Sequence, residues 1–132
     1  MQLRLDITKQ AEAVVVRCHG RIVFGQEVDE LRLAVLSLLK ETNRLVLALG
    51  GVEQIDSEGL AALVGLFISA RNRGGELKLA DLSPKFRELL RVTRLDEVFK
   101  TYMSVDEAIA SLQGVKTTLA GSKAREEEET QF

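Results

Sequence analysis

The sequence predicts an α/β fold: one domain with a mixed, mostly parallel β-sheet, an initial antiparallel hairpin and about four α-helices. Three observations support this prediction. Two apolar, β-prone segments near the start are separated by a link of hairpin length. A short continuous apolar run, residues 45–49, is typical of a strand buried on both faces. Beyond it, helical and strand-like segments alternate, as they do when helical crossovers join parallel strands.

The first two strands are predicted from alternation and valine content. Leu3, Leu5 and Ile7 alternate with polar residues, which is the pattern of a half-buried strand. Residues 13–18 are rich in valine, which favours β-structure. The short polar link at residues 9–12 predicts that the two strands pair antiparallel.

Cys18 and His19 are the only cysteine and the only histidine of the chain. A lone cysteine excludes an intramolecular disulfide, favours a reducing compartment and, in an apolar run, is expected to be buried. His19 and Gly20 are expected to close the strand. Because no metal-binding residue stands at ligand spacing around His19, we expect a structural histidine, with neither metal nor cofactor.

The segment from Gln26 to Lys40 is predicted to be an amphipathic crossover helix. Acidic residues lie early in it and Lys40 lies late, as the helix dipole favours. Its apolar positions repeat at helical spacing: Val28, Leu31, Val35, Leu38 and Leu39.

The central unit is predicted to be the strand at residues 45–49, bounded by Gly50–Gly51, and a helix that ends near Arg73. Gly74 follows as a stop signal. Apolar residues of this helix recur at i, i+3, i+4 and i+7, which predicts one buried face: Leu60, Leu63, Val64 and Phe67. An aspartate in place of Val64 is therefore expected to unfold the domain.

Residues 76–82 are predicted to form the next strand. Ser83 followed by Pro84 indicates an N-cap and a first-turn proline, and so the start of another helix.

Residues 98–103 are predicted to form a short last strand. Ser104 with Glu107 three residues later is a capping-box pattern, which predicts a final helix that Gly114 ends.

We divide the chain into a domain over residues 1–113 and a tail over residues 114–132. The tail is polar and includes the run Glu126–Glu129, so it has too little apolar surface to order itself. We predict a flexible, acidic C-terminal tail that is only a solvated end. The alternative is an acidic interaction tail. Truncation after Gly114 is expected to leave the stability of the domain nearly unchanged.

The composition excludes several classes of partner. Eighteen basic and twenty acidic residues give a formal charge of −2, which provides no basis for binding nucleic acid or an anionic membrane. No apolar run reaches the length of a membrane span, and the first residues contain no apolar signal core. With 45% apolar residues, the chain can bury a core. We expect a cytoplasmic protein with a protein partner.

Asp56, Ser57, Glu58 and Gly59 join the central strand to the central helix, at the end of the sheet where α/β proteins place functional loops. If Asp56 is the N-cap, Ser57 and Glu58 fall in the first turn, beside N–H groups without intrahelical partners. The segment is then either a capped helix start or a partner-binding loop with Ser57 as a regulatory hydroxyl. A phosphate on Ser57 would add about −1.5 to −2 charges beside two carboxylates.

The sequence argues against an enzyme. A nucleophilic serine needs a general base and an oxyanion hole, but there is no G-x-S-x-G motif, and the single histidine follows a different strand. Gly50–Gly51 and Gly74–Gly75 are isolated pairs without the frame of a phosphate-binding loop. We therefore predict a binding protein.

An ordered set of motifs resembles the STAS domain of bacterial anti-sigma factor antagonists. Its core is the segment 55–63, Ile-Asp-Ser-Glu-Gly-Leu-Ala-Ala-Leu. The apolar residues 45–47 precede this core, and Gly75–Leu79 and the Leu-Ser-Pro turn at 82–84 follow it. With the helix at 104–112, the resemblance spans about residues 1–113 and implies a single STAS-like domain.

The resemblance also implies a function. In that family the serine directly after the aspartate is phosphorylated by an anti-sigma factor that is also a serine kinase. The unphosphorylated antagonist sequesters that factor and so frees a sigma factor. By this resemblance Ser57 is the phosphorylated residue, Asp56 is its neighbour, and the partner is an anti-sigma factor with serine-protein kinase activity.

Two positions differ from the family's pattern. Glu58 stands where many members have Ser or Thr, and its charge disfavours a phosphate on Ser57 by repulsion. The turn after Gly20 reads Arg21-Ile22-Val23-Phe24, where the family often has an acidic residue that faces the phosphorylated serine. Phe24 is either a partner contact or a core residue.

Three functions are compatible with these residues. The first is an antagonist of an anti-sigma kinase that phosphorylation switches. The second is a constitutive STAS subunit of a signalling scaffold or of a membrane-associated transport complex. The third, which the missing catalytic groups disfavour, is an enzyme that uses Ser57.

Overall fold

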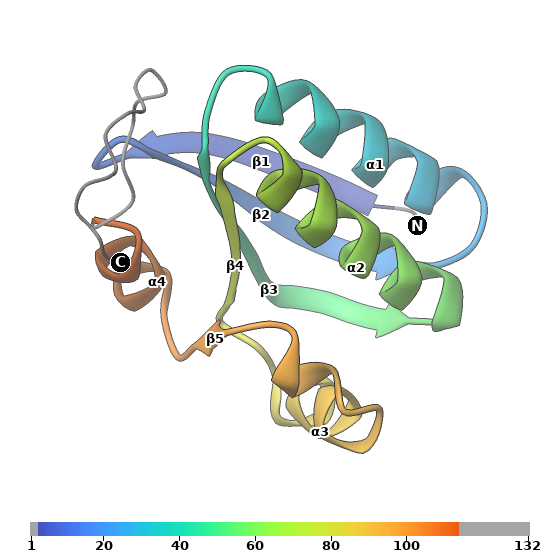
Figure 1. Ribbon diagram of the computed structural model, residues 1–132. Coiled ribbons are helices and arrows are strands. Elements are labelled where there is room, and N and C mark those ends of the chain that lie inside the picture. Colours follow the sequence, from blue (N-terminus) through green and yellow to red (C-terminus); the bar gives the residue numbers. More distant parts are fainter. Residues whose placement is uncertain (1–2, 114–132) are drawn as a thin grey trace.

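Five strands form one mixed sheet, and helices lie on both of its faces (Figure 1). The computed structural model describes residues 3–113. In chain order the elements are β1 (Leu3–Gln10), β2 (Ala13–Ile22), α1 (Gln26–Leu39), β3 (Arg44–Ile55), α2 (Ser57–Asn72), β4 (Glu76–Ala80), α3 (Pro84–Val92), the 3-10 helix η1 (Leu95–Glu97), β5 (Thr101–Tyr102) and α4 (Val105–Ser111).

The strands lie in the sheet in the order of the chain, from β1 to β5. β1 is antiparallel to β2, and every other neighbouring pair is parallel. Both α1 and α2 connect a strand to the next one in the same direction along the sheet. Right-handed crossovers then place both helices on one face. The fold class predicted from the sequence is confirmed.

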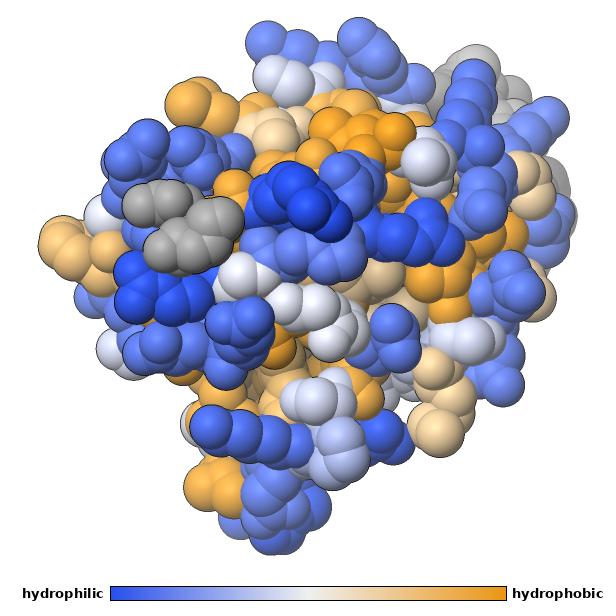
Figure 2. Space-filling view, turned by 180° about the vertical axis from the view of Figure 1, so that it is seen from behind, coloured by the Kyte–Doolittle hydropathy of each residue, from blue (hydrophilic) through white to orange (hydrophobic). Residues whose placement is uncertain are grey.

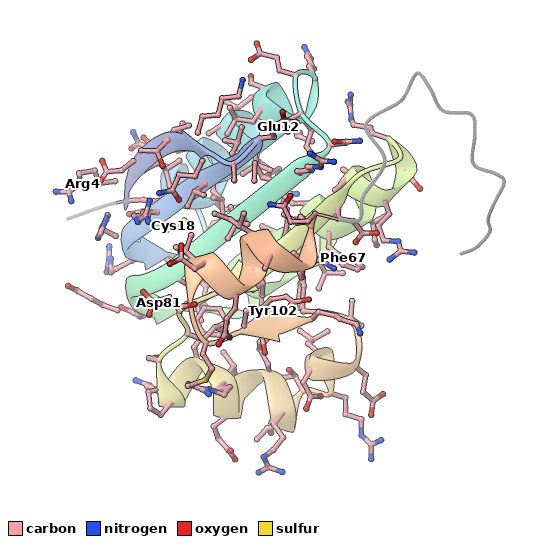
Figure 3. All side chains as sticks on the ribbon, turned by 90° about the vertical axis from the view of Figure 1, so that its left-hand side faces the viewer. Arg4, Glu12, Cys18, Phe67, Asp81 and Tyr102 are labelled. Carbon is pink, nitrogen blue, oxygen red and sulfur yellow. The ribbon has the colours of Figure 1, made fainter. Side chains whose placement is uncertain are left out.

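Each face of the sheet carries an apolar core. The larger core lies under α1 and α2 and includes Val16 and Leu47, while the smaller lies under α4 and includes Val15 and Val46. Neighbouring residues of one strand thus serve opposite cores, as the pleat requires. Figure 3 shows α4 across the sheet and α3 beyond the β5 edge. From behind, hydrophilic side chains cover much of the surface, with smaller hydrophobic patches between them (Figure 2).

The predicted β1–β2 hairpin is confirmed, and its turn is only Ala11 and Glu12. Their φ angles, 50° and 68°, are left-handed, which suits the twist of a two-residue hairpin turn. β1 is an edge strand, so its predicted apolar face is only partly covered. Leu3 and Leu5 pack on the larger core, whereas Ile7 is 49% exposed.

β2 and β3 are longer than predicted. β2 continues to Ile22 and β3 to Ile55, so the strand ends predicted at Gly20 and at Gly50–Gly51 were wrong. The two extensions pair with each other in parallel. Glycine is needed here for close approach and not for a turn, because a Cβ on Gly51 would collide with the ring of His19.

Cys18 and His19 occupy the environments expected for structural residues. Cys18 is buried in the larger core, as predicted, and burial raises the pKa of its thiol to about 12. His19 is partly exposed, and its Nε2 lies 3.3 Å from the carboxylate of Asp6 on β1.

The buried face of α2 is rotated from the predicted one. Leu63 is buried as predicted, but Val64 and Phe67 are only partly buried and Ile68 is 51% exposed. The predicted stripe is therefore only partly correct: Leu60, Val64 and Phe67 pack against the edge of the larger core without being buried. Apolar residues surround this helix, so their spacing alone does not fix the face. The buried residues are Gly59, Ala62, Leu63, Leu66 and Ala70.

The start of α3 agrees with the sequence. Ser83 caps it, with its Oγ accepting the N–H of Phe86 at 3.1 Å, and Pro84 occupies the first turn. β4 ends at Ala80, two residues before its predicted end. Asp81 turns the chain there with a left-handed φ of 58°.

The last strand is shorter than predicted, and the last capping box is modified. Of residues 98–103, only Thr101–Tyr102 form a strand. Ser104 Oγ accepts the N–H of Glu107 at 3.1 Å, which confirms the cap. The Glu107 carboxylate accepts the N–H of Met103 at 3.2 Å instead of the N–H of the cap residue itself.

The predicted tail, residues 114–132, lies outside the described residues, so the division at residue 113 stays a prediction. Within residues 3–113, no helix combines the length and the apolar character that a membrane crossing requires. The same residues contain no cluster of three or more side chains suited to holding a metal ion.

Candidate functional site

The candidate site lies at the carboxyl ends of β2 and β3, which are neighbours in the sheet. β2 leads into the loop at residues 23–25, and β3 leads directly into α2 (Figure 1). The parallel pairing aligns Ile22 with Ile55, so both connections leave the sheet at the same level. The N–H of Asp56 donates to the carbonyl oxygen of Ile22 at 3.4 Å, which extends this pairing to the start of the helix.

Asp56 joins the two connections through its carboxylate. Oδ1 accepts the N–H of Gly59 at 2.8 Å and caps α2, as predicted. Oδ2 accepts the N–H of Phe24 at 2.9 Å. These bonds, first that from Phe24 and then that from Gly59, hold the pKa of the Asp56 carboxyl below its usual value of 3.8. Asp56 is therefore an anion that holds two loops together.

Ser57 and Glu58 form the exposed part of the first turn. Both residues are exposed, and within the described part of the chain neither side chain has a hydrogen bond or an ion pair. Ser57 is the first residue of α2, where the helix dipole and the free N–H groups favour an anion. The hydroxyl is thus accessible to a second protein.

Gly59 is the buried member of the four predicted residues. A Cβ there would collide with the carbonyl oxygen of Ile22 and lie 2.9 Å from Cγ1 of Ile55. Only glycine lets α2 approach the ends of β2 and β3 this closely. Gly59 therefore positions Ser57 and Glu58 and presents no surface of its own.

Phe24 is the site residue whose position the sequence left open. Its side chain is 74% exposed, so the alternative that Phe24 is a core residue was wrong. The N–H of Val28 donates to the carbonyl oxygen of Val23 at 3.2 Å, and Gly25 turns the chain with a φ of 112°. With the bond to Asp56, these features hold the loop so that the ring faces solvent.

Sequence reasoning did not find the contact between Phe24 and Asp56. Local patterns detect the cap of α2, because Asp56 and Gly59 are three residues apart. The bond to Phe24 spans 32 residues and depends on the two extra residues of β2, Arg21 and Ile22. The unusual aromatic residue after a strand was the one available signal.

Residues 4–108 match the STAS domain family; this range includes β1 from Arg4 onward, all of β2 to β5 and the first half of α4. This chain belongs to the STAS domain family. The STAS domain is 30% identical over 99 residues to the anti-sigma-B factor antagonist of Bacillus subtilis (strain 168), covering 74% of this chain and 89% of that protein.

Solved structures share the fold of this STAS domain. An anti-sigma factor antagonist from Mycobacterium paratuberculosis matches with a TM-score of 0.73 at 22% identity, over 84% of this chain and 94% of that one. SpoIIAA, a Bacillus cell fate determinant solved in its phosphorylated form, matches with a TM-score of 0.64 at 18% identity, over 83% and 100% of the two chains.

Proposed function

We propose that this STAS domain is an anti-sigma factor antagonist: it binds an anti-sigma factor and so regulates transcription indirectly. The observation that carries the proposal is the exposed Ser57 hydroxyl at the start of a helix whose cap Asp56 already supplies. The family resemblance and the antagonist of Bacillus subtilis support the class of partner.

The binding surface that we propose consists of Phe24, Ser57, Glu58 and Ala61, and we call it the switch surface. All four residues are exposed. The hydrogen bonds of Asp56 and the close packing of Gly59 fix the backbone that carries them. Phe24 offers a large apolar contact with few rotatable bonds, the kind of side chain that dominates many protein interfaces. An aromatic group beside a carboxylate suits a partner surface with an apolar pocket next to a basic residue.

Phosphorylation of Ser57 is the switch. A phosphate there meets the positive end of α2, so the domain keeps its fold. The bound partner, in contrast, meets about 1.5 to 2 added negative charges next to Glu58. Because an unpaired charge at an interface costs about 2–5 kcal/mol, the modified form is released.

Ser57 serves here as a phosphate acceptor and not as a catalytic nucleophile. A nucleophilic serine requires a base within hydrogen-bond reach. His19, the single histidine, instead contacts Asp6 at 3.3 Å, on the β1 side of the sheet. The neighbouring carboxylate, Asp56, accepts a backbone N–H on each oxygen, and these bonds lower its pKa, which makes it a weaker base. The domain therefore acts by binding.

A kinase assay tests this proposal. The purified chain is incubated with ATP and an anti-sigma factor kinase, and mass spectrometry locates the phosphate. We expect one phosphate, on the peptide that contains Ser57. Ser57→Ala should abolish it, whereas Ser37→Ala, which changes an exposed serine of α1, should not. Phosphate on another residue of the wild-type chain would refute the assignment.

A further inference from the structure

The second half of β3 has an open edge. β3 pairs with β2 as far as Ile55, but β4 covers only residues 44–48 on the other side. After β4 the Asp81 carboxylate packs against Gly50, at the place where a Cβ would stand. Within the described part of the chain, no strand pairs with residues 52–55 on this side. We call these four residues the open edge.

A groove of about 380 Å³ runs between the open edge and α3. Figure 1 shows α3 beside the half of β3 that β4 leaves uncovered. The groove has mainly apolar walls: Val52 and Ile55 on the strand, and Phe86, Leu89 and Val92 on the helix. Val92 is 64% exposed, so the apolar surface continues to the outer rim.

The backbone of the open edge offers hydrogen bonds to this groove. The N–H of Asp56 points to β2, where it donates to Ile22. In an extended chain, neighbouring residues direct their N–H and C=O groups to opposite sides, so those of Ile55 point away from β2. The register with β2 skips Glu53, so the open edge contains a β-bulge and the regular alternation holds for Gln54 and Ile55. An extended polypeptide can supply matching groups there, which a lipid or a small apolar ligand does not.

The charges at the rim also suit a polypeptide. Glu53 lies on the strand side and Lys85 on the helix side, and within residues 3–113 neither has an ion-pair partner. Glu88, the third charged group of the groove, is engaged by Arg91, whose Nε lies 3.0 Å from its Oε1. Nucleic acid or an anionic lipid would meet two carboxylates and one ammonium group here.

We propose that this groove binds an extended segment of a protein partner, which adds to the open edge as a strand. Apolar side chains at every second position of that segment fill the space between Val52 and Leu89, and a basic side chain pairs with Glu53. Such strand addition combines backbone bonds for affinity with side-chain pockets for specificity. This surface goes beyond the switch surface and does not depend on the phosphorylation of Ser57.

The test uses a phage-displayed library of random linear peptides, selected on the full chain. The most enriched peptide is then titrated into isotope-labelled chain by NMR. We expect apolar residues at alternate positions of the selected peptides, and shifted amide signals at residues 52–55 and 85–92. Val92→Glu should weaken binding by at least about ten-fold. The matched control, Leu33→Glu on α1, is also exposed, at 70%, and should bind as the wild type does.

A second peptide tests strand pairing itself. N-methylation of alternate backbone nitrogens removes donors and keeps the side chains, so it should weaken binding by about ten-fold or more. The proposal is overturned by equal binding of the methylated peptide, by unchanged binding to Val92→Glu, by signals that shift elsewhere or by the absence of enriched sequences. Because no anti-sigma factor or kinase is present, these outcomes are independent of the proposed antagonist function.

Discussion

The backbone N–H of Phe24 donates a hydrogen bond to the Asp56 carboxylate at 2.9 Å, although 32 residues separate the two in the chain. The same carboxylate caps α2 through Gly59. One anion thus sets both the position of an exposed aromatic ring and the start of the helix that carries Ser57. Asp56 therefore shapes the switch surface although its own oxygens are occupied.

Asp56→Ala should destabilise the domain more than the loss of a cap alone. Removal of a capping side chain costs about 1 kcal/mol, and loss of the Phe24 bond adds about 0.5–1.5 kcal/mol. Ser83→Ala is the matched control, because Ser83 caps α3 and, among residues 3–113, its side chain bonds only to Phe86. Urea unfolding should give the larger loss for Asp56→Ala.

Hydrogen exchange then separates the two roles of Asp56. The amide of Phe24 should exchange faster in Asp56→Ala than in wild type, whereas in Ser83→Ala its exchange rate should be unchanged. Equal exchange of this amide in wild type and Asp56→Ala would mean that the bond does not hold the loop.

The sequence predicted most of this fold because its signals are local. Ser83, Ser104 and Asp56 were recognised as caps from residues within one turn. The buried face of α2 was not predictable, because apolar residues surround that helix and only the neighbouring elements decide which side is covered. The strand extension through Gly50–Gly51 was missed for a similar reason. Glycine there admits the side chains of His19 and Asp81, which come from other strands and loops.

At the candidate site, too, the local features were predicted and those that depend on distant residues were not. Ser57 and Glu58 were placed in the first turn by the N-cap pattern alone. The exposure of Phe24 depends on a bond to a distant carboxylate, which no local pattern encodes.

Stability should depend on pH through Asp56. Its folded-state pKa is lowered, so the stability that it contributes is present above the unfolded pKa of about 3.9 and is lost as the pH falls through the folded value. Wild type should therefore be more stable than Asp56→Asn at neutral pH, and the difference should shrink below about pH 4. Urea unfolding of both proteins at each pH measures this difference in the free energy of unfolding. A difference that stays constant down to acidic pH would contradict the claim that Asp56 stabilises the fold as an anion.

Replacing two glycines of α2 by alanine should change the stability of the domain in opposite directions. Gly59→Ala places a Cβ against the Ile22 carbonyl and should cost about 1–3 kcal/mol. Of the described residues, a Cβ on Gly65 would approach only the Arg32 guanidinium, with Nη1 at 3.7 Å, so Gly65→Ala should stabilise the helix by about 0.5–1 kcal/mol. Thermal unfolding of both variants checks this pair. Similar effects in both would show that Gly59 is not needed for close packing.

Phe24→Ala should weaken binding of the anti-sigma factor by about 2 kcal/mol, the loss typical of a buried aromatic anchor. The fold should remain intact, because the ring is 74% exposed in the free domain. Leu33→Ala, which truncates another exposed apolar side chain near the middle of α1, is the control. Surface plasmon resonance with the immobilised anti-sigma factor measures both. Equal affinity of Phe24→Ala and wild type would remove Phe24 from the switch surface.

The most direct test of the central claim is a calorimetric titration of the anti-sigma factor with wild type, Ser57→Asp and Glu58→Lys. Glu41→Lys serves as the control, because Glu41 is exposed where α1 leads into β3, at the opposite end of the parallel strands. Ser57→Asp adds a third carboxylate to those of Asp56 and Glu58, and the added charge stays unpaired because Glu58 already pairs with the basic residue expected on the partner. Glu58→Lys opposes that basic residue directly. Each should weaken binding by at least about ten-fold, or about 1.4 kcal/mol, while Glu41→Lys binds as wild type does. Equal affinity of all four proteins, with circular dichroism showing intact folds, would contradict the claim that the start of α2 is the interface.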